Sequence, residues 1–261
     1  MIRFGPAGIG PVEEAISNLE EYHKLGLTAC EIAFTYGAYI KKKEDAEKIG
    51  KKAKELGIRL SIHAHYWINL NSEEKDKIEK SKERILECCK VGTWLGAQVV
   101  VFHSGFYGDD REKAYENIKN AILDIEERIK ENHYTPKLAP EVMGKINVFG
   151  SVEEIRKLTE DTGCSFCIDF AHVLARYKDY NFKEVFEKFS DCKDFHIHFS
   201  GIVYGDKGEK HHIKTTENEL KQLISSLPNN KDITIINESP ENVEDSVLGL
   251  KIYEANKSKF H

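Results

Sequence analysis

The chain has 261 residues, of which 40% are hydrophobic and 31% charged, and its formal net charge is −6 at pH 7. These values describe an ordinary globular protein with a core of normal size. The acidic balance argues against indiscriminate nucleic-acid binding, although a local basic face or bound metal cations can still attract phosphates.

The sequence opens with MIRFGPAG, which lacks the basic and apolar regions of a signal peptide, and it contains no run of about 18 apolar residues. We therefore expect a cytoplasmic protein with no membrane attachment, and we expect no protein partner. The six cysteines lack the dense spacing of a secreted disulfide scaffold, so we expect reduced thiols. Cys164 and Cys167 form a CxxC pattern, but Cys167 falls inside a predicted buried strand, which favours core packing over zinc or redox chemistry.

Short apolar runs and helical periodicities alternate along the whole chain. The predicted strands cover residues 3–5, 29–34, 58–63, 98–103, 138–142, 165–169, 195–199 and 233–238. The predicted helices cover 12–22, 44–56, 72–95, 110–131, 152–158, 182–189, 217–227 and 243–256, and residues 200–214 are predicted to form a loop.

This strict alternation, with no linker or low-complexity segment, predicts an α/β fold: a single (β/α)8 TIM barrel in which residues 1–261 form one domain. A doubly wound open sheet is the alternative. No glycine-rich dinucleotide fingerprint opens a helix after a strand, which favours the barrel.

Side chains of the metal-ligand type recur where the predicted strands end. They are His63, His103, Glu141, Asp169, His172, His198 and Glu238, with Glu209, His211 and His212 in the loop after the seventh strand. The carboxyl ends of all strands meet on one face of a barrel, so we expect these groups to lie together. Imidazoles and carboxylates suit zinc, with manganese or iron as alternatives, and more than four ligands require more than one metal.

Two purely structural interpretations are alternatives to a functional site. Asp169 could cap a helix while His172 is a satisfied polar residue. Tyr66 and Trp67, in the loop after the third strand, could pack at the barrel rim rather than bind a substrate. His196 lies two residues before His198 on the same strand, so its side chain should point the same way. It could bind a metal directly or contact a residue that does.

These candidate ligands and the motifs around them resemble the endonuclease IV family, the TIM-barrel apurinic/apyrimidinic endonucleases with a three-zinc site. The resemblance covers nearly the whole chain. It rests on HAHYWINL (63–70), FHSG (102–105), CIDFAH (167–172) and GEKHH (208–212), with Glu141, His198 and Glu238 at the remaining ligand positions.

The resemblance implies an enzyme that hydrolyses the phosphodiester at abasic sites in double-stranded DNA, as in base-excision repair. It implies three zinc ions, with manganese as the alternative. One is held by His63, His103 and Glu141, a second by Glu141, Asp169, His198 and Glu238, and a third by His172, Glu209 and His211. Glu141, Asp169 and Glu238 would be catalytic, and Tyr66 and Trp67 would enter the minor groove beside a flipped nucleotide.

The chain departs from the family pattern at several positions. Glu209 stands where the family has Asp, and Phe170 and Ala171 replace a small polar pair. The fifth strand lacks the usual Asn after its Glu, and Ser-Pro follows Glu238. The loop at residues 35–40 has no Arg to invade the DNA stack. These changes affect DNA recognition more than metal binding.

Two other functions remain open at this point. The first is a sugar or sugar-phosphate isomerase or epimerase of the xylose-isomerase-like barrels, which use fewer metals. The second is a non-catalytic nucleic-acid-binding barrel that keeps zinc as structure. A count of bound metal separates nuclease from isomerase, because three ions per chain favour the nuclease and one the isomerase.

Overall fold

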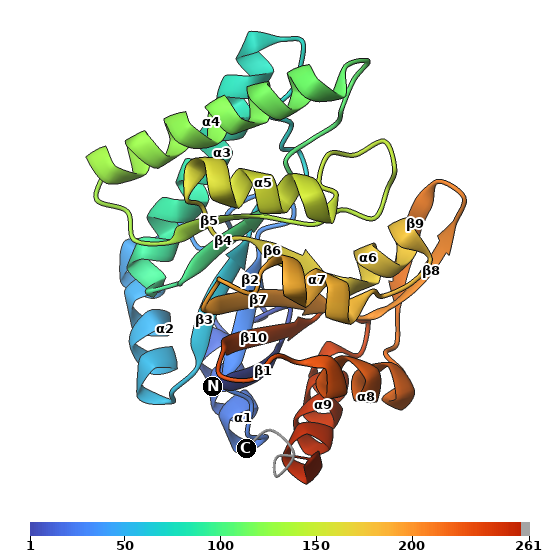
Figure 1. The fold of residues 1–261 in the computed structure, drawn as a ribbon. Coiled ribbons are helices and arrows are strands. Elements are labelled where there is room, and N and C mark those ends of the chain that lie inside the picture. Colours follow the sequence, from blue (N-terminus) through green and yellow to red (C-terminus); the bar gives the residue numbers. More distant parts are fainter. Residues whose placement is uncertain (257–261) are drawn as a thin grey trace.

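The computed structural model describes residues 1–256, and its parallel strands form a barrel surrounded by helices (Figure 1). The barrel strands are β1 (Ile2–Pro6), β2 (Ala29–Ala33), β3 (Arg59–His63), β4 (Val99–Phe102), β5 (Lys137–Pro140), β6 (Cys167–Asp169), β7 (Asp194–Phe199) and β10 (Asp232–Asn237). The helices are α1 (Ala15–Lys24), α2 (Lys43–Glu55), α3 (Lys75–Leu95), α4 (Arg111–Glu131), α5 (Val152–Thr162), α6 (Phe170–Tyr177), α7 (Phe182–Lys188), α8 (Glu217–Ser226) and α9 (Asn242–Asn256).

Two four-stranded parallel sheets, ordered β1-β10-β7-β6 and β2-β3-β4-β5, make up the barrel wall. Single parallel bridges, from Ala7 to Glu31 and from Glu141 to Cys167, join the two sheets at both seams. The closed α/β barrel predicted from the sequence is therefore confirmed. At the β1–β2 seam only glycine fits position 5, because a Cβ there would lie 1.8 Å from the carbonyl oxygen of Ala29.

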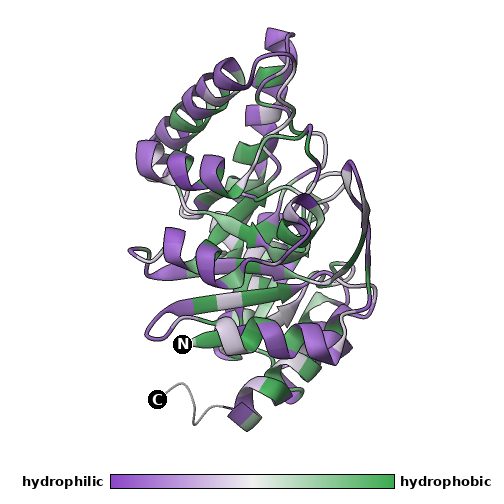
Figure 2. Ribbon diagram, turned by 45° about the vertical axis from the view of Figure 1, so that its right-hand side comes forward, coloured by the Kyte–Doolittle hydropathy of each residue, from purple (hydrophilic) through white to green (hydrophobic). Residues whose placement is uncertain are grey.

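Local signals explain where several helices begin and end. Ser151 and Glu154 form a reciprocal capping box at the start of α5, and Thr216 and Glu219 form another at the start of α8. Gly96, with φ of 70°, ends α3 in the left-handed conformation and leads the chain into β4. Figure 2 shows the resulting pattern, with apolar strands inside and helices whose polar residues lie on the outer surface.

Two segments differ from the sequence-based expectation. Residues 200–214, predicted as a loop, form an antiparallel hairpin of β8 (Gly201–Gly205) and β9 (Gly208–Ile213), because a two-residue turn between two glycines lets the strands pair. The segment after β6, predicted only as the first turn beyond a strand, continues as α6. Both lie over the same end of the barrel, next to each other (Figure 1).

The barrel interior has an apolar part and a polar part. Val99, Val101, Ala139 and Cys167 form a small buried cluster inside it. Elsewhere the inward side chains include Glu31, Ser61 and His196, all buried. Within residues 1–256, no helix combines the length and apolar character needed to cross a membrane.

Candidate metal centre

The strand ends place the predicted side chains around one mouth of the barrel. His63 and Asp169 are the last residues of β3 and β6, and His198 lies one residue before the end of β7. His103, Glu141 and Glu238 directly follow β4, β5 and β10. Because Asp169 pairs with His198 in the β6–β7 register, their side chains point to the same side of the sheet.

The first group of possible ligands consists of His63, His103 and Glu141, whose ligand atoms all lie within 4.8 Å of one another. Glu141 Oε2 lies 2.9 Å from His103 Nε2 and 3.3 Å from His63 Nε2. Both imidazoles therefore converge on one carboxylate oxygen. These are the residues that the resemblance assigned to the first zinc.

The second group joins Glu141 to Asp169, His198 and Glu238 within the same 4.8 Å limit. His198 Nδ1 lies 3.2 Å from Glu141 Oε1 and 3.4 Å from Glu238 Oε1. Glu141 thus presents one oxygen to each group. A carboxylate in this position can bridge two ions.

The third group is formed by Asp169, His172 and His212. Asp169 Oδ1 accepts a hydrogen bond from the backbone N–H of His172 at 2.9 Å and so caps α6, while Oδ2 lies 3.3 Å from His172 Nδ1. The capping role and the site role of Asp169 are therefore compatible, because the two carboxylate oxygens serve them separately.

His212, and not the predicted His211, enters the third group. In the hairpin, His212 is paired with Ile202 and His211 with Val203, so the two side chains leave opposite faces of β9. His212 Nδ1 lies 2.6 Å from Ser200 Oγ, which holds the ring over the barrel mouth, whereas His211 is exposed at the edge of the pocket. The sequence showed both histidines, but only the hairpin register distinguishes them.

Glu209 lies beside the third group and outside it. Its carboxylate packs against Gly144, where a Cβ would meet Glu209 Oε2 at 2.1 Å. Its Oε1 lies 3.8 Å from Lys145 Nζ, and its Oε2 is buried without a hydrogen-bond partner. Negative charge from Glu209 nevertheless contributes to the raised pKa of His172.

These residues fit metal ions chemically. Asp169 Oδ2 is fully buried and has no hydrogen-bond partner, an unfavourable state that a cation would relieve. The donors are imidazole nitrogens and carboxylate oxygens, which suit zinc or manganese. Metal binding by each named residue stays a prediction.

The buried carboxylates and imidazoles of this centre shift one another's pKa values. Burial by itself would raise the pKa of Glu141, but the imidazoles around it, His103 foremost, hold that pKa well below its usual range. Burial would likewise lower the pKa of His63, but hydrogen bonding and charge from Glu141 outweigh it and raise the pKa to about 9. Charges on Asp169 and Glu141 similarly raise the pKa of His172 against the effect of burial.

We expect the stabilisation by zinc to increase as the pH rises to about 9. Folding raises the pKa of His63 through its ion pair with Glu141. This pair therefore stabilises the metal-free protein fully below about pH 6.5, and the stabilisation is lost as the pH rises through about 9. Zinc needs neutral His63 and competes with the proton over the same range. Thermal unfolding at pH 6.5 and 9, with and without zinc, measures both effects; a zinc-induced shift that stays constant with pH contradicts the prediction. A His63→Gln variant should show a weaker pH dependence.

A pocket of about 440 Å³ opens above the three groups and is lined by several of their members. Tyr66 forms part of its wall and stacks on His103 with ring centroids 5.8 Å apart. Trp67 is 62% exposed at the rim, where Tyr36 packs edge-on against it. Lys145 and Lys210 also line the pocket and place positive charge there.

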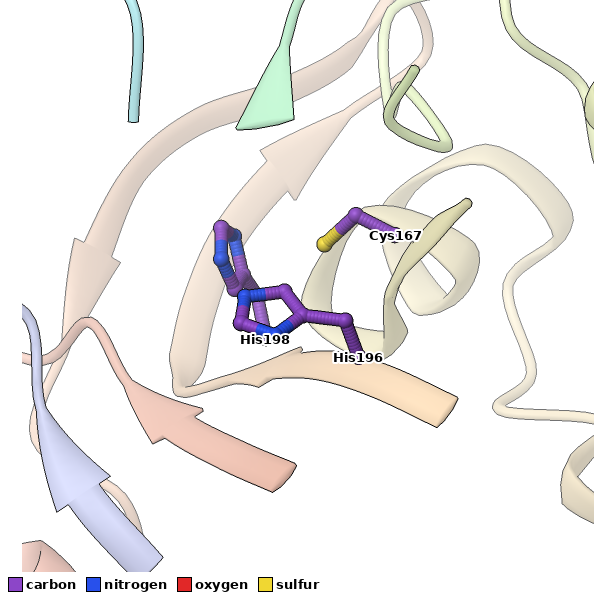
Figure 3. Close-up of side chains that lie close together, drawn as sticks. All are labelled: Cys167, His196 and His198. Atoms are coloured by element: carbon purple, nitrogen blue, oxygen red, sulfur yellow. The ribbon is translucent and has the colours of Figure 1, made fainter. Parts of the chain in front are cut away.

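Sequence reasoning placed His196 beside the site but missed the buried carboxylate of Glu31 deeper in the barrel. Cys167, His196 and His198 place ligand-type atoms within 4.8 Å of one another, and Figure 3 shows the sulfur of Cys167 directed toward the imidazoles. Glu31 on β2 contacts both histidines. Glu31 gave no signal in the sequence, since it sits in the middle of a strand and not at its end.

The family model described as xylose isomerase-like TIM barrel matches residues 19–249. The chain belongs to this family. An uncharacterized protein from Methanocaldococcus jannaschii is 36% identical over 275 residues, covering 97% of each chain. A probable endonuclease 4 from Aquifex aeolicus is 26% identical over 187 residues, covering 65% of each chain. The resemblance to endonuclease IV is thus supported at low identity.

Solved structures share the fold. Endonuclease IV from Thermus thermophilus superposes with a TM-score of 0.72 at 21% identity, covering 98% of this chain and 99% of that one. A D-tagatose 3-epimerase-like protein superposes with a TM-score of 0.73 at 19% identity, covering 99% and 100%. At these identities the structural likeness establishes the barrel and leaves the reaction to be argued from the site.

Proposed function

We propose that this protein is a metal-dependent endonuclease that hydrolyses the phosphodiester at abasic sites in double-stranded DNA. The observation that carries the proposal is the set of three adjacent ligand groups linked by Glu141 and Asp169 at the barrel mouth. Bound metals would polarise the phosphodiester, lower the pKa of the attacking water and stabilise the leaving oxygen. Zinc is the metal proposed, with three ions per chain and manganese as the alternative.

The protein's own side chains would position the substrate. The pocket of about 440 Å³ would take one extrahelical sugar-phosphate, and the nucleotide would leave the duplex to reach the ligand groups. Lys145 and Lys210 would attract the flanking phosphates. Tyr66 and Trp67 would fill the space vacated in the duplex and stack on neighbouring bases.

The decisive experiment combines metal analysis with a cleavage assay. Zinc per chain is measured by elemental analysis, and the same preparation is incubated with a duplex carrying one abasic site and with the matched undamaged duplex. Three ions and selective cleavage of the abasic strand support the proposal. A fully metal-loaded protein that leaves the abasic duplex intact refutes it.

A sugar epimerase is the second candidate, because the D-tagatose 3-epimerase-like structure shares the whole barrel and the pocket is also large enough for a monosaccharide. Epimerase chemistry in these barrels needs one metal between two acidic residues. One bound ion per chain, together with conversion of a ketohexose, would favour it over the nuclease.

Replacing Trp67 with alanine should weaken binding to the abasic duplex. Stacking of an aromatic ring on a base contributes about 1–3 kcal/mol, which corresponds to roughly a 5- to 150-fold change in affinity. Fluorescence anisotropy with a labelled abasic duplex measures the loss, and zinc content serves as the control because Trp67 lies outside the three groups. Unchanged affinity would assign Trp67 to rim packing with Tyr36.

A further inference from the structure

A buried carboxylate lies behind the proposed metal centre. Glu31 is fully buried in β2, and its Oε1 lies 2.9 Å from Nε2 of His198. The other ring nitrogen of His198, Nδ1, faces Glu141 and Glu238. His198 therefore stands between a carboxylate inside the barrel and the ligand groups at its mouth.

The second oxygen of Glu31 is held by neighbours that are not among the predicted ligands. Ser61 Oγ donates a hydrogen bond to Glu31 Oε2 at 2.8 Å, and His196 Nε2 lies 2.8 Å from the same oxygen. His196 and His198 leave β7 two residues apart, on one side of the strand. Figure 3 shows their two rings next to Cys167. The carboxylate is fixed from β3 and β7 together.

Glu31 Oε1 and His198 Nε2 are in contact at 2.9 Å but are not aligned for a hydrogen bond, and neither atom has another hydrogen-bond partner. We propose that Glu31 is a positioning residue, which would accept the Nε2–H of His198 when a metal binds Nδ1 and so keep the Nδ1 lone pair directed at an ion held between Glu141, Asp169 and Glu238. A neutral imidazole has one N–H, so an acceptor at Nε2 leaves Nδ1 free to bind a metal. A carboxylate that hydrogen-bonds to Nε2 also makes Nδ1 a stronger electron-pair donor to a metal. This inference rests on the proposed metal centre and on no assumption about the substrate.

The arrangement requires a carboxylate in particular. Glu31 faces three donors, from Ser61, His196 and His198, and an ionised carboxylate can accept from all of them. A glutamine of the same size has one carbonyl oxygen, and its NH₂ would point donors at one of the three donor groups around Glu31. Glu31→Gln therefore changes the hydrogen bonding with little change in volume.

Zinc affinity of Glu31→Gln tests the inference. Competition titrations against a chromophoric chelator should show one zinc bound about 10- to 100-fold more weakly than in the wild type, with the others nearly unchanged. Ser61→Ala is the matched control, because it removes a hydrogen bond to the same carboxylate and leaves both imidazole contacts. Ser61→Ala should weaken zinc binding clearly less than Glu31→Gln does. Equal zinc affinities for Glu31→Gln and the wild type overturn the proposal.

A spectroscopic measurement on the wild type keeps the test valid even if the variant does not fold. In ¹⁵N-histidine spectra of the zinc-loaded protein, His198 should carry its proton on Nε2 and bind zinc through Nδ1. A proton on Nδ1 overturns the proposal. So does X-ray absorption showing a sulfur ligand, because Cys167 and the two histidines would then hold a metal themselves. Neither readout uses DNA, so a failed cleavage assay leaves the role of Glu31 standing.

Discussion

Glu141→Gln is expected to lose at least one zinc per chain and to cut the cleavage of abasic DNA by more than about a hundredfold. The Glu141 carboxylate lies 2.9 Å from His103 Nε2 and 3.2 Å from His198 Nδ1, and it belongs to two ligand groups at once. The glutamine amide has one neutral oxygen where the Glu141 carboxylate has two charged oxygens. At least one ion would therefore lose a ligand. Even a displacement of about 1 Å can cost roughly a hundredfold in rate.

Elemental analysis and single-turnover cleavage measure the two losses separately. Glu87→Gln is a suitable control, because it makes the same chemical change on α3, outside every ligand group of the described chain. Thermal unfolding of the metal-free forms verifies that Glu141→Gln folds. A Glu141→Gln protein with the wild-type zinc count would exclude the bridging role.

His212→Ala and His211→Ala should differ strongly although the two residues are adjacent. His212 belongs to the group with Asp169 and His172, whereas His211 leaves the opposite face of β9. We expect His212→Ala to lose one zinc and about a hundredfold or more in cleavage rate, because the remaining two side chains leave that ion underligated and displaced. His211→Ala should retain its zinc and most of its activity.

The pair of variants also decides between the structure and the family resemblance. The resemblance assigned the third ion to Glu209 and His211 together with His172. If His211→Ala loses the zinc and His212→Ala keeps it, the hairpin must adopt a register shifted by one residue when metal is bound.

Much of this site follows from the sequence for a simple physical reason. Parallel barrel strands all end on one face, so residues such as His63 and Asp169 were expected to meet once each was placed at the end of a strand. The hydrophobic runs and helical periodicities were sufficient for that placement, and strand boundaries off by one or two residues did not alter it. Asp169 and His172 were placed together in the same way, because His172 is the third residue after Asp169, across the β6–α6 junction.

The tertiary structure alone decided two further points. Which histidine of the pair at 211 and 212 enters the site depends on the pairing of β8 with β9, since a shift of one residue reverses the face of every side chain. That Glu31 contacts His198 depends on strands β2 and β7, which are more than 160 residues apart in sequence and meet across the barrel interior. No local pattern encodes a contact of that kind, because it exists only after all the strands have closed into the barrel.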